Sequence, residues 1–407
     1  MPAAPAGPEL LQRLLHPHPV DEFFSRVWEK EPLHVTRDEN PVLEDWFREL
    51  MTLDDVDRLL TTIYGAEPRA LDSLRMGRDG VMIPAEEYLS SRDWAFAEVD
   101  VERVLALHRA GASIILNGVD AMLEPVAELC DAIARFAGVG VHANAYITPR
   151  EAQGFPLHFD THDVFLLQVA GEKDWKLHRS TVPLATPALQ GKEDVGPLDS
   201  GTSLCLRTGE VLYIPRGLLH EGVTSAAMSV HLTIGMHPHT WAQLFRDLLA
   251  ELEAEDVDFR RSVPLWRSAQ AEFEDALNAL TARLDDSDRA HRTADRKMDK
   301  LRARSGPSLR GLFTQIHEPE RISLETIVRL REHARPEIQG NGTEVVLRFG
   351  SSVLTLPAFT RAHLDALCAG GPIRGSDLPA TLDDEGKLVL LRRLAREGLL
   401  VAAADGG

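Results

Sequence analysis

Cysteine is scarce in this chain of 407 residues, which contains three. Cys130, Cys205 and Cys368 lie too far apart for a short zinc-binding spacing, and their odd number argues against a disulfide framework. We therefore expect a protein of the reducing cytoplasm. The first ten residues also lack a basic segment followed by an apolar one, so we expect neither a secretory signal nor a membrane anchor there.

Positive charge is in deficit, because 44 Lys and Arg stand against 63 Asp and Glu and leave a formal net charge of −19. Such a field repels nucleic acid phosphates and favours cationic partners such as basic protein segments. Long apolar runs are missing too, since no stretch approaches the roughly 18 residues that a membrane span needs. The remaining composition, 44% hydrophobic and 26% charged, is typical of a folded globular protein. We expect neither nucleic acid nor a membrane as a partner.

The hydrophobic pattern divides the chain into four parts. Residues 1–100 predict a helical lead-in with loops, and residues 101–240 contain short alternating runs that predict a β-sandwich or barrel. Residues 241–305 return to a helical period, and residues 306–407 suggest a winged-helix-like domain. The expected strands of the second part are Ser113–Leu116, Val141–Thr148, Val164–Ala170, Trp175–His178, Val211–Ile214 and Met228–Ile234.

Two apolar stripes at helical spacing follow the predicted barrel, and we expect them to cover each other or a second copy of the chain. The first stripe comprises Trp241, Leu244, Phe245, Leu248, Leu249 and Leu252, and the second comprises Phe273, Leu277, Leu280 and Leu284. In the last part we expect strands at Glu344–Phe349, Ser352–Leu356 and Gly398–Ala402, and helices at Thr360–Cys368 and Asp383–Glu397.

One His-x-Asp pair and a distant histidine carry the strongest chemical signal. In a strand, residues i and i+2 point to the same face, so His158 and Asp160 converge. A third imidazole, His220, follows a turn sixty residues after Asp160. Two histidines and one carboxylate on one side of a metal leave three positions open, as in non-haem Fe(II) oxygenases. A His-x-Asp pair alone also arises by chance, so the surrounding sequence must show whether this pair binds a metal.

That context is a polar face on two expected strands. His142, Asn144, Tyr146 and Thr148 alternate with apolar residues on one strand, and Ser229, His231 and Thr233 do so on another. This pattern predicts a barrel lined for a polar ligand. Lys173 lies in an expected hairpin over 169–175, where it can share the inward face with Trp175 and Leu177. An inward lysine needs an anion, such as the distal carboxylate of a metal-bound dicarboxylate; the alternative is a solvated hairpin lysine.

Four segments that contain these residues resemble the JmjC-type ribosomal oxygenases, a family of the cupin superfamily that uses Fe(II) and 2-oxoglutarate. The segments are residues 23–33, 144–149, 153–175 and 212–221. The resemblance implies an α+β fold with a double-stranded β-helix, the JmjC barrel, at 101–240. It also implies a helical dimerisation region at 241–305 and a C-terminal winged-helix domain at 306–407.

The resemblance also implies roles for individual residues. His158, Asp160 and His220 match the iron ligands and are the catalytic centre, and Lys173 matches the residue that binds the 5-carboxylate of 2-oxoglutarate. Asn144, Tyr146 and Thr233 match polar positions that line the cosubstrate pocket. The implied activity is O2-dependent hydroxylation of an Arg or a His side chain in a ribosomal protein. Because the triad satisfies the metal, we expect the remaining histidines of the region to be structural or solvent-facing; these are His142, His162, His231 and His237.

Three alternatives remain open. The chain could be a JmjC oxygenase that acts on another peptide or protein, including a natural-product precursor or a methylated lysine. It could be a non-catalytic regulator that senses a ligand and binds DNA, for which the best support is the segment Arg289–Arg310 with eight Lys or Arg against two Asp. It could also be a cupin metalloenzyme without 2-oxoglutarate, which would leave Lys173 and Asn144 unexplained.

Overall fold

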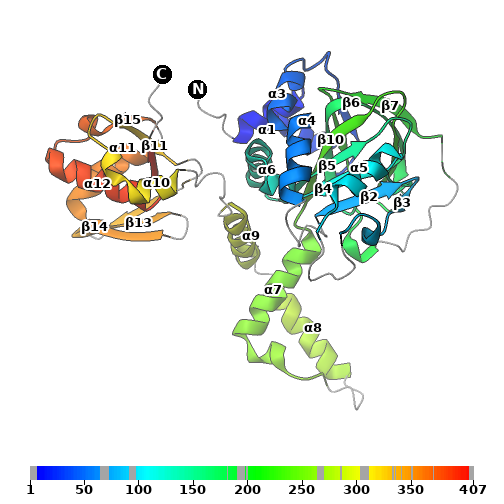
Figure 1. Ribbon diagram of the computed structural model, residues 1–407. Helices are drawn as coiled ribbons and strands as arrows, with labels where there is room; N and C mark the ends of the chain where they lie inside the picture. The colour runs from blue at the N-terminus through cyan, green and yellow to red at the C-terminus, as the bar shows by residue number, and fades with distance from the viewer. Residues whose placement is uncertain are drawn as a thin grey trace. The chain divides into compact units, whose positions relative to one another are not determined.

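The computed structural model divides the protein into two compact units, Gly7–Leu301 and a unit that contains Arg302–Gly407. Both combine helices with β-sheet, as the sequence predicts (Figure 1). The finer division into four parts stays a prediction. The structure describes residues 7–64, 73–90, 98–180, 182–189, 198, 200–263, 270–284, 287–302, 311–331, 334, 336–340, 342–349, 352–369 and 371–402.

The first hundred residues contain the expected helices but also three short strands. The expectation of helices and loops is therefore incomplete, because all three strands join the main sheet of the larger unit. The helices are α1 (Gly7–Leu15), α2 (Val20–Glu22), α3 (Leu43–Leu50) and α4 (Leu53–Arg58), with π-helical η1 (Phe23–Val27) and η2 (Leu59–Tyr64) and the 3-10 turn η3 (Ala85–Glu87). The strands are β1 (Leu33–Val35), β2 (Leu74–Arg78) and β3 (Val81–Met82).

The main sheet of the larger unit has ten strands. Its order is β1-β8-β6-β10-β5-β4-β2-β3, and β7 and β9 each pair with β6. The remaining strands are β4 (Ser113–Asn117), β5 (Gly140–Thr148), β6 (Asp163–Ser180), β7 (Thr202–Arg207), β8 (Val211–Ile214), β9 (Leu218–Val223) and β10 (Ser229–His237). The strands expected between residues 101 and 240 are thus present in the structure.

The expected hairpin over 169–175 is wrong, because β6 runs without reversal from Asp163 to Ser180. Before Gly171 the strand pairs with β8 and β10, and after it with β7 and β9. Gly171 has a φ of 68°, and a Cβ there would lie 1.8 Å from the Met228 carbonyl oxygen. The glycine therefore permits a close backbone approach where β6 changes partners, rather than a turn.

Helices cover the apolar side of the sheet. On β5 and β10 the residues Ala143, Ala145, Val230 and Leu232 are fully buried in the core. They share this core with apolar residues of α1 and of α6 (Glu124–Ala137). The opposite, polar side of both strands is thereby left for a site. Helix α5 (Val101–Arg109) and the turns η4 (Val119–Ala121) and η5 (Pro187–Leu189) complete this region.

A buried polar network fixes the start of β6, directly after the His-x-Asp pair. The Tyr213 hydroxyl donates a hydrogen bond to Asp163 Oδ1 at 2.8 Å and accepts one from the Glu29 backbone N–H at 2.9 Å. Arg216 pairs with the other oxygen of Asp163 at 2.7 Å. Since a buried charge is costly without partners, this network ties the lead-in, β6 and β8 together beside the motif.

The region after β10 is helical, as predicted. Its elements are α7 (Trp241–Glu255), η6 (Val257–Arg260), α8 (Gln270–Leu284) and α9 (Ser287–Arg302). The first stripe is covered along one edge only, because Leu248 is 2% exposed whereas Trp241 is 77% exposed. Phe273 and Leu277 of the second stripe are also exposed. Among the described helices, none combines the length and apolar character needed to cross a membrane.

The smaller unit contains the elements that the sequence predicts between residues 344 and 402. Its two three-stranded sheets have the orders β15-β11-β16 and β12-β13-β14. The elements are β11 (Ile327–Leu330), β12 (Glu337–Gly340), β13 (Glu344–Phe349), β14 (Ser352–Pro357), β15 (Ile373–Arg374), β16 (Leu400–Ala402), α10 (Leu312–His317), α11 (Arg361–Cys368), α12 (Asp384–Arg396), η8 (Pro319–Arg321), η9 (Ala358–Thr360) and η10 (Gly375–Asp377). The winged-helix arrangement stays a prediction.

Candidate metal centre and cosubstrate pocket

The structure brings His158, Asp160 and His220 together. One nitrogen or carboxylate oxygen from each residue lies within 4.8 Å of the others. His158 and His220 face each other in an isolated antiparallel bridge, with His158 N–H to His220 O at 3.1 Å and His220 N–H to His158 O at 2.8 Å. His158 and Asp160 therefore lie just before β6 and outside a regular strand, contrary to the sequence argument, and the backbone bridge to β9 aligns them.

Backbone carbonyls set the tautomer of both imidazoles. His158 Nδ1 donates to the Pro156 oxygen at 2.8 Å, and His220 Nδ1 donates to the Leu218 oxygen at 2.9 Å. Each Nε2 is thus left with a free lone pair, and that of His220 lies 3.6 Å from Asp160 Oδ2. Burial, reinforced by His158, lowers the pKa of His220 to about 4, so this imidazole is neutral at neutral pH. Two oriented imidazoles and one carboxylate fit a divalent iron ion with open positions.

Lys173 lies buried beside this group and is 5% exposed, which excludes a solvated lysine. Its ammonium lies 4.9 Å from the centre of the Trp175 ring, and burial lowers its pKa to about 8. Within the described part of the chain no carboxylate pairs with it. A Cβ at Gly222 of β9 would lie 2.8 Å from Lys173 Cε, so this glycine leaves the lysine its space. The side chain is a buried cation available for an anion.

Asn144, Tyr146 and Thr233 lie on the same side of neighbouring strands. Thr233 of β10 is opposite Asn144 of β5, and His231 is opposite Tyr146. The Tyr146 and His231 rings stack at 5.0 Å with 2° between their planes. Burial raises the pKa of Tyr146 to about 12, so its hydroxyl stays protonated and can donate. Asn144 Oδ1 accepts a hydrogen bond from the Gly118 N–H at 3.0 Å, and the Asn144 side chain is also hydrogen-bonded to Tyr146, so the two residues form one polar unit of this face.

His231, which we expected to be structural or solvent-facing, is buried beside Tyr146 and Trp175. Its ring lies 5.7 Å from that of Trp175, and it is 2% exposed. Within the described chain, His231 Nδ1 and Trp175 Nε1 are buried without a hydrogen-bond partner. Buried polar atoms of this kind normally have partners, so two next to Lys173 indicate room for a polar ligand. The signal in the sequence was the position of His231 two residues before Thr233, on the same polar face.

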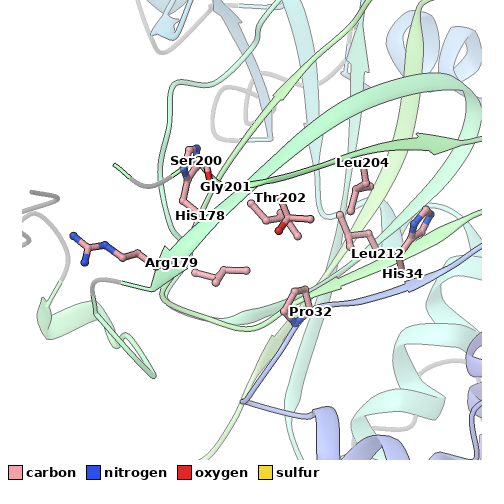
Figure 2. Close-up of a pocket in the computed structure, with 11 residues that line it drawn as sticks. Pro32, His34, His178, Arg179, Ser200, Gly201, Thr202, Leu204 and Leu212 are labelled. Atoms are coloured by element: carbon pink, nitrogen blue, oxygen red, sulfur yellow. The ribbon is translucent and has the colours of Figure 1, made fainter. Parts of the chain in front are cut away.

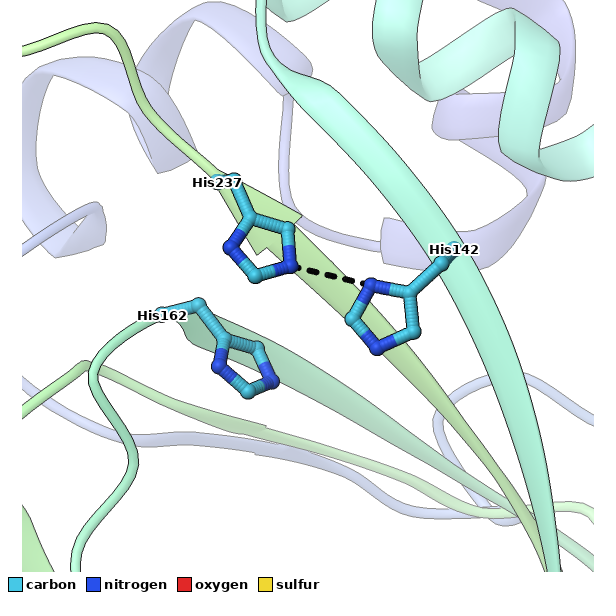
Figure 3. A group of neighbouring side chains, drawn as sticks. All are labelled: His142, His162 and His237. Carbon is cyan, nitrogen blue, oxygen red and sulfur yellow. Dashed lines mark hydrogen bonds between the residues drawn. The ribbon is translucent and has the colours of Figure 1, made fainter. Parts of the chain in front are cut away.

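Three further histidines, expected to be structural or solvent-facing, also gather. One ring nitrogen of each of His142, His162 and His237 lies within 4.8 Å of the others (Figure 3). They come from β5, from the residue before β6 and from the end of β10.

A separate pocket of about 500 Å³ lies between β1, the second half of β6, β7 and β8 (Figure 2). Its wall includes His34 and Leu212, and His34 pairs with Glu210 at 3.0 Å. None of the three candidate iron ligands is among its described lining residues, so this pocket is distinct from the metal centre.

Comparison with known proteins confirms the family resemblance. A JmjC domain matches residues 119–244. Ribosomal oxygenase 2 of Mus musculus is 27% identical over 344 residues, which cover 79% of this chain and 70% of that protein. Ribosomal oxygenase 1 of Homo sapiens is 28% identical over 305 residues, 72% of this chain and 43% of that protein. The chain therefore spans less than half of the second relative.

A third relative and two solved structures also match this chain. A protein of Aedes aegypti named bifunctional lysine-specific demethylase and histidyl-hydroxylase NO66 is 30% identical over 270 residues, 64% of this chain and 40% of that protein. Escherichia coli ribosomal oxygenase YcfD matches with a TM-score of 0.50 at 16% identity, over 95% of this chain and 98% of that one. Its complex with cobalt and 2-oxoglutarate matches with the same TM-score and identity, over 94% and 98%. At this identity the likeness shows the fold.

Proposed function

Because the chain carries a JmjC domain and is related in sequence to the ribosomal oxygenases, we propose that it is an Fe(II)- and 2-oxoglutarate-dependent protein hydroxylase. The observation that carries this proposal is the pairing of two features in one pocket. His158, Asp160 and His220 bring one ligand atom each within 4.8 Å of one another, and the buried Lys173 beside them has no carboxylate partner in the described chain. The complex of YcfD with cobalt and 2-oxoglutarate supports the same cofactors.

Each group of the chain has a defined task in this proposal. His158, Asp160 and His220 hold the iron, and Lys173 binds the 5-carboxylate of 2-oxoglutarate. Tyr146 and the amide of Asn144 donate hydrogen bonds to the cosubstrate, and Thr233 lines the pocket. The chemistry that such a centre supplies when bound is oxidative decarboxylation of 2-oxoglutarate to succinate and CO2, coupled to hydroxylation of a substrate C–H bond. The buried walls exclude water and hold the groups in fixed orientation.

The proposed substrate is an Arg or a His side chain of a ribosomal protein. Relatives named ribosomal oxygenases support this class, and the net charge of −19 favours encounter with a basic protein. The same charge makes DNA an unfavourable partner.

Mass spectrometry of ribosomal proteins tests the substrate. The proteins are prepared from cells with the gene, without it, and with a His220→Ala copy. We expect one ribosomal protein to carry an added oxygen atom on an Arg or a His only where the intact gene is present. If all three samples have the same masses, the substrate is not ribosomal, and a JmjC oxygenase acting on another peptide or protein becomes the better account.

The proposal extends to the architecture and the assembly. We assign the JmjC domain to a double-stranded β-helix, which the change of partners along β6 supports. We assign the smaller unit to the winged-helix class and the location to the cytoplasm, in keeping with three free cysteines. We also propose a homodimer formed through residues 241–305, because apolar side chains of α7 and α8 are exposed there.

A further inference from the structure

Three histidines converge at one end of the sheet, and the strand register explains why. Strand β10 lies between β5 and β6, and Gly235 of β10 is opposite both His142 and Val164. His237 stands two residues after Gly235 on the same face of β10, and His162 stands two residues before Val164. Three neighbouring strands therefore bring the imidazoles of His142, His162 and His237 to one place (Figure 3).

Gly235 provides the space for this group. A Cβ at position 235 would lie 2.4 Å from His142 Cε1 and 2.9 Å from His162 Cδ2. Any larger residue would therefore displace two of the three rings. Thr233, the neighbouring position on this face of β10, carries a side chain. Gly235 carries none, and the rings of His142 and His162 occupy the space above it.

The rings present nitrogen atoms to one another rather than to the backbone. His237 Nε2 and His142 Nδ1 lie 3.0 Å apart, a contact that requires one proton between two basic atoms. The His162 and His237 rings stack at 4.6 Å, and those of His142 and His237 at 4.9 Å. Burial lowers the pKa of His142 and His237, which favours the neutral imidazoles that a metal ion binds, and a bound ion would replace the proton that this pair shares. Neutral imidazoles at such spacing are the ligands that zinc, nickel and cobalt prefer.

We propose that His142, His162 and His237 form a second metal site, separate from the iron centre, that binds a divalent transition-metal ion of the zinc class through three imidazole nitrogens. Metal–nitrogen bonds of about 2.0 Å in tetrahedral geometry place ligand nitrogens about 3.3 Å apart. The three ring nitrogens already lie within 4.8 Å of one another.

The fourth position of the proposed site is open. His237 is exposed, so the site is reached from solvent, and three protein ligands leave one position for water or for a donor atom of a bound molecule. His162 stands two residues after Asp160, so this group lies beside the candidate iron centre. The site itself does not depend on the proposed function.

Zinc binding to the full-length protein, freed of any affinity tag, tests the proposal. Equilibrium dialysis against micromolar ZnCl2, followed by elemental analysis, gives the number of ions per chain. Five proteins are compared: wild type, His158→Ala/His220→Ala, His142→Gln/His237→Gln, the combination of all four changes, and His291→Gln. His291 is exposed on α9 and serves as the matched control.

We expect about two ions per chain for the wild type and the His291→Gln control, about one for each double variant, and none for the combination. X-ray absorption of zinc on His158→Ala/His220→Ala should show three imidazole nitrogens at about 2.0 Å.

If His142→Gln/His237→Gln does not fold, the single variant His237→Gln, a change at the exposed end of β10, takes its place. The proposal is overturned if His158→Ala/His220→Ala binds no zinc, or if changing His142 and His237 leaves the zinc content at the wild-type value. If the wild type binds one ion and His158→Ala/His220→Ala still binds one, the candidate iron ligands do not bind zinc. That result counts against the proposed function and not against the second site.

Discussion

At the scale of single residues, the candidate site depends on atoms that do not face the metal. The Nδ1 atoms of His158 and His220 donate to backbone carbonyls, and this leaves Nε2 as the ligand of each ring. Such outer hydrogen bonds fix the tautomer and the ring orientation before any metal arrives. The Lys173 ammonium instead lies 4.9 Å from the centre of the Trp175 ring, and Gly222 leaves room for the lysine because a Cβ there would lie 2.8 Å from Lys173 Cε.

Replacing Lys173 with Ala should weaken cosubstrate binding more than turnover. The lost contact is to the non-reacting end of 2-oxoglutarate, so the apparent KM for 2-oxoglutarate should rise about ten- to hundredfold while kcat changes little. Succinate release at a series of 2-oxoglutarate concentrations measures both constants. Lys176→Ala, three residues further along β6 and on its opposite face, is the control and should leave the KM unchanged. An unchanged KM for Lys173→Ala would show that another group binds the 5-carboxylate.

The residues of the candidate iron site could be proposed from sequence, whereas the histidine group at the end of the sheet could not. His158 and Asp160 form a local pair, whereas His220 lies sixty residues further along the chain, and the roles of His220 and Lys173 were implied by the family resemblance. The grouping of His142, His162 and His237 depends on which strands are neighbours and on their register. Nothing in the spacing of residues 142, 162 and 237 shows that β10 lies between β5 and β6.

At the scale of elements, β6 organises the site because it serves two sets of partners. Its first half pairs with β10 and carries the core, and its second half pairs with β9 and carries Lys173. The sequence predicts both halves but places a hairpin between them, since Gly171 and the polar residues after it are typical of a turn. In the structure the strand continues through Gly171, where the backbone of Met228 approaches closely. Residues 171 and 228 are far apart in the sequence, so the residues around Gly171 do not indicate this contact.

Gly171→Ala should therefore destabilise the protein more than an alanine at a comparable glycine. A positive φ costs about 1–2 kcal/mol for a residue with a Cβ, and forcing a carbon into a filled space costs about 1–3 kcal/mol more. Gly118 is the matched control, because its φ of 70° is close to the 68° of Gly171 and nothing lies within 4 Å of its added Cβ. Urea unfolding should give a lower free energy of unfolding for Gly171→Ala than for Gly118→Ala. Equal losses would show that β6 is not constrained by Met228.

At the scale of the whole molecule, exposed apolar surface gathers on the helices after the sheet. Trp241, Phe273 and Leu277 are 77%, 55% and 63% exposed. Apolar residues at helical spacing that stay uncovered within the chain indicate a surface that another chain covers. The sequence predicted the two stripes, but it left open whether they cover each other, and the structure shows that much of both remains exposed.

Phe273→Glu/Leu277→Glu should convert the protein from a dimer to a monomer. Two carboxylates in an apolar interface must be desolvated on association, which opposes binding. Sedimentation velocity should show twice the 45.0 kDa mass of one chain for the wild type and a single chain for the variant. Val389→Glu on α12, where Val389 is 64% exposed, is the control and should remain dimeric. A monomeric wild type would contradict the proposed assembly.

The most direct test of the account is the conversion of 2-oxoglutarate to succinate by the purified protein. Succinate is measured by NMR with ribosomes as substrate, in air, with and without added Fe(II), for the wild type and for His220→Ala. We predict succinate from the wild type that depends on Fe(II), and none above background from His220→Ala, because the iron centre then lacks a ligand. A wild type that forms no succinate, or a His220→Ala protein as active as the wild type, would contradict the assignment of this pocket as an Fe(II) and 2-oxoglutarate site.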